Sequence, residues 1–266
     1  VAFFAKRHKR SGITLHMERG LRALGHDVLA INKRKAERLV GDRLAWWWLR
    51  RRVEAFRPDV VLVFTFDLEP DRIEELRAVA RTATFFDDCP ERLDDRIARA
   101  ARASDVFFIT NRGQVPLYEQ ELRLTPAYVT GGTDPTDHFR VAADPAWASD
   151  VAFIGTPGLH TSRVELLARI AERHDVEVFG RGWERHAAHC PRLRLGGTVE
   201  PEGYARVCAT SRIVLGINEV NDDPYYFSNR TFLTLACRGF HLTHYVPRLE
   251  KVFERGVHLD WFADAD

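Results

Sequence analysis

Short apolar runs alternate with amphipathic stretches through the first half of the chain. The apolar runs predict strands at 1–6, 27–32, 60–64, 83–86 and 105–110. Periodicity typical of helices predicts helices between these strands, at 14–24, 69–80 and 93–103. Because strands and helices alternate, we expect parallel βαβ units with right-handed crossovers.

The pattern breaks and then begins again in the second half. Residues 126–148 combine two adjacent glycines with several prolines and aspartates, which predicts a linker. After the linker, strands are expected at 151–154, 176–179, 193–195, 213–217 and 240–243, and helices at 162–173, 202–210, 229–237 and 248–254. The chain is therefore predicted to be an α/β protein with two Rossmann-like, doubly wound domains, 1–125 and 149–266, facing a cleft.

Composition narrows the function classes. The 39 Lys and Arg residues nearly balance the 38 Asp and Glu residues, and a net charge of +1 argues against a dedicated nucleic-acid binder. The four cysteines are scattered, with no Cys-x-x-Cys pair, so we expect reduced thiols in a cytoplasmic protein rather than a disulfide framework or a structural zinc site. No apolar run approaches the roughly 18–20 residues that cross a bilayer. We expect residues to be missing at both ends.

Three glycine-bearing turns each follow a strand of the second half. They are the turns at Gly155, at 180–182 around Arg181, and at 196–197. A parallel sheet needs tight turns simply to close each βα unit, so each turn by itself carries little weight. All three lie at the same predicted sheet edge, where glycine lets the backbone approach a ligand closely and Arg181 can reach into a cleft.

Residues 228–231 mark a helix start at that same edge. Ser228 or Asn229 can cap the helix, and Arg230 can pair with a diphosphate through two parallel hydrogen bonds. Helix N-termini attract anions because their free N–H groups and the helix dipole favour negative charge. An exposed arginine beside an ordinary cap is the alternative. The arrangement favours an enzyme that handles a nucleotide-linked substrate.

Carboxylates follow two buried strands of the first half. Asp87 and Asp88 come directly after one predicted strand, and Asp67 has the equivalent place after the preceding strand. A carboxylate there can act as general base on an acceptor hydroxyl or bind a sugar hydroxyl, and it can equally cap the next helix. The first βα loop, with Ser11 and Gly12, is basic and is predicted to contact phosphate or acceptor.

Two further segments have alternative interpretations. His186, His189 and Cys190 have a spacing that hints at a metal site, but no further ligand lies close by in sequence, so a structural or solvent-facing role is favoured. The tryptophans at 46–48 lie between basic segments, which can mark a membrane-surface or nucleic-acid contact. A helix that packs its tryptophans and solvates its arginines is the more frequent arrangement.

Several motifs of the second half together resemble one known family. They are Ser149-Asp-Val-Ala-Phe-Ile-Gly155 with Arg163, Phe179-Gly-Arg-Gly-Trp183, Gly197-Thr-Val199 with Tyr204, and Phe227-Ser-Asn-Arg-Thr-Phe232. On these motifs, roughly 149–262 resembles the C-terminal domain of the spore-maturation-protein-type glycosyltransferases, within the broad assembly of retaining enzymes with the GT-B fold. The first half, including Phe86-Asp-Asp-Cys-Pro90, is similar more loosely.

This resemblance implies a nucleotide-sugar donor in the C-terminal domain, no metal requirement, no cofactor, and sugar transfer in an interdomain cleft. Arg230 and Arg181 would stabilise charge on the departing diphosphate, and Asp87 or Asp88 would serve the acceptor. Together with the glycine turns, the resemblance implies a donor site lined by Gly155, Gly180, Gly182, Val199, Asn218, Ser228, Asn229 and Thr231. Acceptor-side contacts are expected from Ser11, Gly12 and Asp67.

The chain departs from the wider assembly at two positions. Leu233 and His241 stand where many relatives carry a glutamate, so the usual sugar and ribose contacts are not expected from these side chains. The last helices of the fold, which usually cross back to the first domain, are expected to be absent from this chain.

The sequence therefore predicts a metal-independent, retaining, hexosyltransferase-like enzyme that moves a sugar from a nucleoside-diphosphate sugar to an unknown acceptor. A non-catalytic nucleotide-sugar binding protein is the alternative, because of Leu233 and His241. A nicotinamide-dependent enzyme is disfavoured, because no Gly-x-Gly-x-x-Gly opens a helix after a strand. Nucleic acid is not an expected partner, and contact with a membrane surface stays open.

Overall fold

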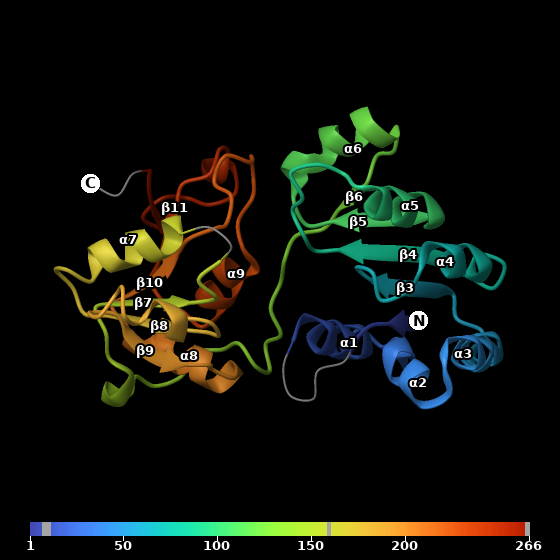
Figure 1. Ribbon diagram of the computed structural model, residues 1–266, viewed down its shortest axis with the longest axis horizontal. Helices are drawn as coiled ribbons and strands as arrows, with labels where there is room; N and C mark the ends of the chain where they lie inside the picture. Colours follow the sequence, from blue (N-terminus) through green and yellow to red (C-terminus); the bar gives the residue numbers. More distant parts are fainter. Residues whose placement is uncertain (7–11, 159–160, 264–266) are drawn as a thin grey trace. The chain divides into compact units, whose positions relative to one another are not determined.

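The structure is a computed structural model that describes residues 1–6, 12–158 and 161–263 (Figure 1). Contacts within the chain divide it into two units, Val1–Thr130 and Gly131–Asp266, and each is described by itself. Each unit has its own sheet and its own hydrophobic clusters, as is typical of a domain. The boundary falls inside the segment that the sequence assigns to a linker.

The first unit contains a six-stranded parallel sheet in the order β2-β1-β3-β4-β5-β6. Its strands are β1 (Ala2–Phe4), β2 (Leu29–Ile31), β3 (Val60–Phe64), β4 (Arg81–Phe86), β5 (Val106–Ile109) and β6 (Ala127–Tyr128). Its helices are α1 (Ile13–Ala23), α2 (Lys33–Val40), α3 (Asp42–Phe56), α4 (Pro70–Leu76), α5 (Asp95–Ala103) and α6 (Val115–Leu122), with a 3-10 turn at Arg112–Gln114.

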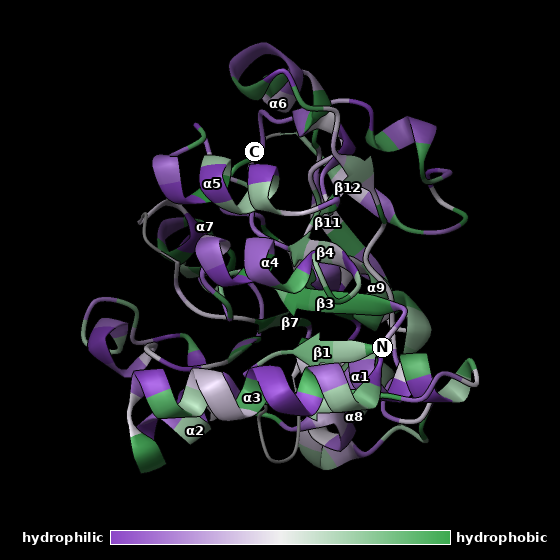
Figure 2. Cartoon of the chain, turned by 90° about the vertical axis from the view of Figure 1, so that its right-hand side faces the viewer, coloured by the Kyte–Doolittle hydropathy of each residue, from purple (hydrophilic) through white to green (hydrophobic). Residues whose placement is uncertain are grey.

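Successive residues of these strands point to opposite faces of the sheet, and helices cover both faces. Phe4 and Val61 pack in one cluster with Leu49 of α3. Phe3 packs in another cluster with Leu21 of α1. Figure 2 shows α3, α4 and α5 in front of the strands of this unit. The uninterrupted apolar runs of the sequence are therefore explained by burial on both sides.

The second unit contains another six-stranded parallel sheet, in the order β12-β11-β10-β7-β8-β9. Its strands are β7 (Val151–Ile154), β8 (Val176–Phe179), β9 (Arg194–Gly197), β10 (Ile213–Gly216), β11 (His241–His244) and β12 (Asp260–Phe262). Its helices are α7 (Ser162–Ile170), α8 (Pro201–Thr210) and α9 (Asn229–Ala236), with 3-10 turns at Pro145–Trp147, Glu184–His186 and Leu249–Lys251.

The core of the second unit also lies on both faces of its sheet. Phe153 and Leu215 pack with Leu167 of α7 on one face. Val214 packs with Val207 of α8 on the other face. This two-sided, doubly wound arrangement confirms the predicted α/β fold class.

The structure differs from the expected elements at the end of the chain. The helix expected at 248–254 is only the 3-10 turn Leu249–Lys251. Arg248 adopts a φ of 71°, a left-handed conformation that a helix interior does not allow. The strands β6 and β12 and the helices α2 and α6 were not expected. The three residues of β12 are all only half-buried, and so short a run gives no periodic signal.

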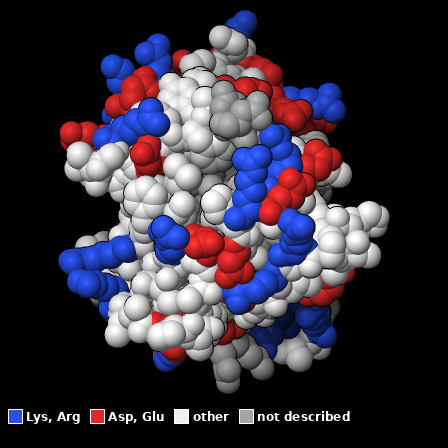
Figure 3. Space-filling model, turned by 90° about the vertical axis from the view of Figure 1, so that its left-hand side faces the viewer, with Lys and Arg blue, Asp and Glu red and all other residues white. Residues whose placement is uncertain are grey.

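The polar surface of the chain carries both signs of charge. On the face seen in Figure 3, basic and acidic side chains alternate over the surface of the second unit.

Among the helices of the described residues, none combines the length and the apolar character needed to cross a bilayer.

One titratable group lies inside the second core. His241 is 2% exposed on β11, with Nδ1 3.1 Å from the Val214 carbonyl oxygen and Nε2 3.2 Å from Thr231 Oγ1. Since a carbonyl only accepts, Nδ1 carries the proton and Nε2 accepts from the Thr231 hydroxyl. Burial, assisted by the positive charge of Arg230 and opposed by the hydrogen bond to Val214, lowers the pKa of His241 to about 4. The imidazole is therefore neutral at pH 7.

This buried imidazole predicts a specific loss of stability in mild acid. The unfolded state gains a proton at His241 near pH 6.5, whereas the folded state gains it only near pH 4, so the free energy of unfolding falls as the pH is lowered through that window. We expect His241 to account for about 2 kcal/mol of loss between pH 7.5 and 5.0. Urea unfolding of wild type and His241→Gln at both pH values measures this contribution.

The comparison between the two proteins removes contributions that they share. Asp105, Asp150 and Asp260 have lowered pKa values because of hydrogen bonds to their carboxylates, and their loss of stability comes in more acidic solution. His189→Gln, at an exposed site, serves as the matched control and should keep the pH dependence of wild type. An equal pH dependence in His241→Gln would show that this imidazole is not buried and neutral.

Candidate functional site

The second sheet contains a point where the strand order reverses. From β7 the chain runs outward to β8 and β9, and it then returns to β10 on the other side of β7. In open α/β sheets, ligands bind outside the carboxyl ends of the strands at such a switch point. The residues that follow β7 and β10 are therefore where a site is expected on topological grounds alone.

Two arginines lie at this switch point, on the same aromatic ring. The guanidinium carbons of Arg230 and Arg163 lie 5.0 Å and 5.4 Å from the ring centre of Phe153. Arg230 donates from Nη1 to the Ile154 carbonyl oxygen at 3.0 Å, and from Nη2 to the Ile217 carbonyl oxygen at 3.1 Å. Arg163 Nη2 also donates to Ile217, at 3.1 Å. Both side chains thus clamp the carboxyl ends of β7 and β10.

The electrostatics of this pair favour an anion. Burial lowers the pKa of Arg230 to about 10, and the neighbouring charge of Arg163 acts in the same direction. Burial also lowers the pKa of Arg163, although Glu219, 3.0 Å from its Nη2, opposes that shift. Both guanidinium groups stay charged at neutral pH, and Glu219 is the one carboxylate that faces them among the described residues. The centre keeps a positive charge that a diphosphate would neutralise.

The first glycine turn makes room for this arginine. A Cβ at Gly155 would fall on Arg230 Nη1, so any larger side chain would displace the guanidinium. A Cβ at Gly180 would fall on the Gly155 carbonyl oxygen, and Gly180 has a φ of 139° that side chains rarely adopt. Gly180 donates its N–H to Gly197 at 2.7 Å. The three predicted glycine turns therefore adjoin one another along the edge of the sheet.

The start of α9 is built as the sequence predicts. Ser228 is the N-cap, and its Oγ accepts hydrogen bonds from the backbone N–H of Arg230 at 3.3 Å and from Arg230 Nε at 3.0 Å. Asn218 Oδ1 accepts from the Ser228 N–H at 3.1 Å. Thr231 is enclosed beneath the helix and bonds to His241, so its side chain supports the helix start from inside. Leu233 is half-buried against the hydrophobic cluster around Val207 of α8 and Val214 of β10, called the α8 cluster below.

Several polar atoms around this loop have no partner. Among the described residues of the second unit, the enclosed side-chain atoms without a hydrogen bond are Arg163 Nε, Asn218 Nδ2, Asn221 Oδ1 and Asn229 Oδ1. All four belong to the β10–α9 loop or to the arginine beside it. Because buried polar groups are normally satisfied, this concentration marks the place where a polar ligand would supply partners.

The other predicted donor residues lie along the same edge with less direct roles. Arg181 is exposed in the turn after β8. The Gly182 N–H donates to Glu184 Oε2 at 3.1 Å, so this N–H is already satisfied. Val199 is half-buried and packs with the α8 cluster. Among the described residues, no hydrogen bond or ring contact joins any of the three to the guanidinium groups of Arg163 and Arg230, and their part in donor binding stays a prediction.

The carboxylates of the first unit follow β3 and β4 as expected. Asp87 is half-buried, and its Oδ1 accepts from Thr65 Oγ1 at 2.8 Å. Burial raises the pKa of Asp87, the nearby charges of Asp88 and Asp67 raise it further, and the bond from Thr65 opposes the shift. Asp88 is exposed. A carboxylate with a raised pKa is a better proton acceptor, which suits Asp87 more than Asp88 to general-base work.

Asp67 is held by its own unit. Its Oδ2 accepts from the backbone N–H of Lys6 at 2.7 Å, and its Oδ1 lies 3.3 Å from Arg34 Nη2. Asp67 therefore ties the end of β1 to the start of α2, which is a structural task. Gly12 forms the N-cap of α1 with a φ of 132°. Ser11 lies outside the described residues.

Arg163 and Glu219 were not among the site residues expected from the sequence. A positional signal was present, because Arg163 is the second residue of α7 and Arg230 is the second residue of α9. These helices follow the neighbouring strands β7 and β10, so the two arginines occupy equivalent places. Glu219 carried no such signal, since it lies in an irregular loop.

Comparison with known proteins supports a glycosyltransferase. Residues 163–266 match the sequence model of a family described as "Glycosyl transferase-like". The matched region contains both arginines and all of α9. None of the curated proteins matches the chain in sequence.

Solved structures extend the likeness to both units. HepE from Anabaena, solved in complex with UDP-glucose, has a TM-score of 0.62 at 11% identity, covering 98% of this chain and 84% of that chain. The β-glucosyltransferase of phage T4 has a TM-score of 0.61 at 10% identity, covering 99% of this chain and 84% of that chain. The fold is that of the GT-B glycosyltransferases.

A further solved structure is less similar. A structure described as the GtfA/B complex has a TM-score of 0.50 at 12% identity, covering 83% of this chain. This chain spans only 50% of the length of that protein. At such identities the likeness concerns the GT-B fold, and the chemistry of this chain has to be argued from its own residues.

The contact between Gly155 and Arg230 predicts a coupled loss of stability. Gly155→Ala should lower the free energy of unfolding by about 2–3 kcal/mol, because the added methyl group displaces a partly buried charged group from its carbonyl partners. In an Arg230→Ala background the same substitution should cost much less, since its clash is gone. Urea unfolding of the single and double variants measures this coupling.

A control substitution at another glycine separates the clash with Arg230 from the general effect of replacing glycine by alanine. A Cβ at Gly20, inside α1, would meet nothing within 4 Å, so Gly20→Ala should be neutral or stabilise the protein by up to about 1 kcal/mol. Equal costs of Gly155→Ala with and without Arg230 would mean that the arginine does not occupy this place.

Proposed function

We propose that this chain is a glycosyltransferase of the spore-maturation-protein type, which moves a sugar from a nucleoside-diphosphate donor to an acceptor. The observation that carries the proposal is the group of unsatisfied polar atoms beside the buried guanidinium of Arg163 and the partly buried guanidinium of Arg230, at the switch point of the second sheet. A diphosphate would supply acceptors to the donors and negative charge to the cations.

The diphosphate would sit at the start of α9. Arg230 uses three of its five N–H groups on Ser228, Ile154 and Ile217, so two remain for a ligand. The N–H groups of Arg230 and Thr231 already bond to Ser228, so α9 contributes through its dipole, which adds positive potential at this end of the helix. During transfer, negative charge develops on the departing diphosphate, and fixed donors that already point at that position lower the barrier. Arg181 is exposed in the turn after β8, at the same edge of the sheet, and would add a further positive charge.

The same argument supports transfer without a metal ion. In many phosphate-handling enzymes a divalent cation neutralises the leaving group. Here two guanidinium groups and a helix N-terminus would supply that charge. Retention at the sugar, hexosyl transfer and a cytoplasmic setting belong to the proposal through the family resemblance.

UDP is the nucleotide to test first. HepE is solved with UDP and with UDP-glucose, and it has the same fold over almost the whole chain. On the acceptor side, Asp87 is our candidate for the group that orients the acceptor hydroxyl or takes its proton, because its pKa is raised by burial. Asp88 is the less favoured carboxylate, since it is exposed.

A non-catalytic nucleotide-sugar binding protein is a second candidate. Leu233 is half-buried in the α8 cluster, and His241 is enclosed and neutral inside the core. Neither side chain is available to replace a glutamate that would bind sugar or ribose. Donor binding without turnover against any acceptor, and without slow donor hydrolysis, would favour this candidate.

Arg230 provides the test of the proposal. Arg230→Ala should lower the apparent affinity for UDP, as measured by thermal shift, at least tenfold. It should also lower the rate of sugar transfer or donor hydrolysis by about 10²–10³-fold. Arg230→Lys should recover only part of either effect, because an ammonium group cannot reproduce the planar set of bonds. Thermal shift with UDP, GDP, ADP, TDP and CDP, followed by nucleotide-release assays on the matching sugars, measures both.

The control is Arg212→Ala, which removes an arginine that is 81% exposed and pairs with Asp150. It should leave nucleotide binding unchanged. A folded wild-type protein that responds to none of the nucleotides would contradict the donor-site proposal. Normal turnover in Arg230→Ala would remove this arginine from the mechanism.

A further inference from the structure

The first unit has an apolar face that its own fold does not cover. Leu39, Val40, Leu44, Trp47 and Trp48 lie on α2 and α3, and their exposed fractions range from 46% to 74%. Single exposed apolar side chains are normal on soluble proteins, but five large ones within ten residues are not. We call these five residues the α2–α3 face.

The inward side of α3 shows that the fold does not need this face. Ala45, Leu49 and Val53 are buried at helical spacing and pack toward the sheet. Trp46 is half-buried, and its Nε1 donates to Glu75 Oε2 at 3.0 Å. Of the three adjacent tryptophans, one therefore packs within the unit, and the other two point outward.

The same segment concentrates positive charge. Residues 33–52 contain eight Lys and Arg and only two acidic residues, so their net charge is +6 in a chain whose net charge is +1. Lys33 pairs with Glu37 and Glu69, and Arg50 pairs with Glu54 and Glu75. Within the described chain, no carboxylate lies at ion-pair distance from Lys35, Arg38, Arg43 or Arg51.

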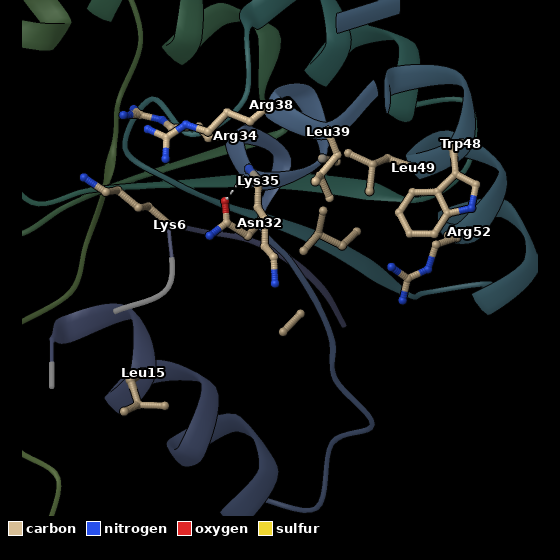
Figure 4. Close-up of a pocket in the computed structure, with 13 residues that line it drawn as sticks. Lys6, Leu15, Asn32, Arg34, Lys35, Arg38, Leu39, Trp48, Leu49 and Arg52 are labelled. Atoms are coloured by element: carbon tan, nitrogen blue, oxygen red, sulfur yellow. Dashed lines mark hydrogen bonds between the residues drawn. The ribbon is translucent and has the colours of Figure 1, made fainter. Parts of the chain in front are cut away.

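A basic cavity of about 1020 Å³ opens beside this face. Its 13 lining residues include five cations and no acidic residue, and Leu39 and Trp48 belong to its apolar wall. Figure 4 shows Arg34 and Arg38 side by side at one end, and Trp48 with Arg52 at the other. The Arg52 guanidinium stacks 4.7 Å from the Trp48 ring centre.

We propose that the α2–α3 face docks the first unit on a membrane surface that carries anionic lipids. Leucine and tryptophan side chains enter the boundary between headgroups and acyl chains, while arginine and lysine reach lipid phosphates. Arg51 and Arg52 stack on Trp47 and Trp48, which places each cation beside an inserting ring. The basic cavity receives a headgroup phosphate.

Charge and side-chain type select this partner over the alternatives. A second copy of the chain would bring a net charge of +6 against another +6, which opposes association through this segment. A nucleic acid would use the cations and the tryptophans, but it would gain nothing from the exposed aliphatic groups of Leu39, Val40 and Leu44. An anionic bilayer complements both the charge and the apolar groups. This inference does not depend on the nucleotide site.

Co-sedimentation of the full chain with lipid vesicles tests the inference. We expect binding to vesicles of phosphatidylcholine with about 30% phosphatidylglycerol, and weak or no binding to phosphatidylcholine alone. Binding should fall steeply as the salt concentration rises to about 0.5 M, because the Debye length then becomes shorter than the reach of the cations.

Two double variants separate the contributions. Lys35→Gln/Arg38→Gln should weaken binding to the anionic vesicles about thirtyfold. Trp47→Ser/Trp48→Ser should weaken it at least tenfold, while leaving a remainder that salt abolishes. All four residues are exposed, so the variants should fold, and their unfolding temperatures and circular dichroism check this.

Matched controls come from elsewhere in the chain. Arg92→Gln/Arg102→Gln removes the same amount of charge from exposed positions outside α2 and α3, and Phe240→Ser removes a large apolar side chain that is 52% exposed. Both should bind vesicles like wild type. Nucleotide thermal shifts should also be unchanged in the two α2–α3 variants, which keeps this inference separate from the proposed donor site.

Three results would overturn the inference. The first is that folded wild-type protein does not bind anionic vesicles. The second is that it binds neutral and anionic vesicles equally well. The third is that neither double variant binds anionic vesicles more weakly than wild type. Light scattering after size-exclusion chromatography tests whether a second copy of the chain binds this face instead. A wild-type dimer that becomes a monomer in Trp47→Ser/Trp48→Ser would make the face an interface between copies.

Discussion

The second unit depends on two guanidinium groups that share one phenyl ring. Arg163 and Arg230 each lie in the first turn of a helix that follows one of two neighbouring strands, and both fold back over Phe153 to the carbonyl groups where those strands end. Removing a cation from water is costly unless hydrogen bonds and opposite charge compensate. Carbonyl oxygens and Glu219 supply part of that compensation, and the rest of the site follows from how the chain accommodates the pair.

The accommodation is visible in the backbone around the pair. The turn after β7 has glycine at 155 because Arg230 occupies the space of a side chain there. The next turn has glycine at 180 because the Gly155 carbonyl comes close to it. Ser228 both caps α9 and holds Arg230 Nε, so the helix start and the guanidinium are fixed by one hydroxyl. The sheet edge is thus preorganised around positive charge, which is the condition for electrostatic catalysis.

Sequence reasoning located this edge but not the orientation of its side chains. Alternating strands and helices predicted the α/β class, and the structure confirms it. The order strand, loop, helix put Arg230 at the carboxyl edge, because parallel strands end on one side of a sheet. The same reasoning could not tell that Thr231, one residue later, turns inward to His241, or that Asp67 is taken up by Lys6 and Arg34. Those outcomes depend on contacts between residues distant in sequence, which periodicity does not encode.

Two groups of cations, one in each unit, are held in different ways, and the difference bears on function. In the second unit, Arg163 and Arg230 are enclosed and bonded to carbonyl oxygens, so their positions are fixed to within a narrow range, as a reacting diphosphate requires. In the first unit, Lys35 and Arg38 are exposed and have no carboxylate partner within the described chain, so their side chains can adapt to a ligand. Adaptable cations beside exposed tryptophans suit a fluid, laterally averaged surface rather than one defined small molecule. A single chain with a net charge of only +1 therefore holds one pair of arginines in place at the edge of its second sheet and leaves exposed cations without carboxylate partners, among the described residues, on α2 and α3; each arrangement matches the physical state of the anion it would meet.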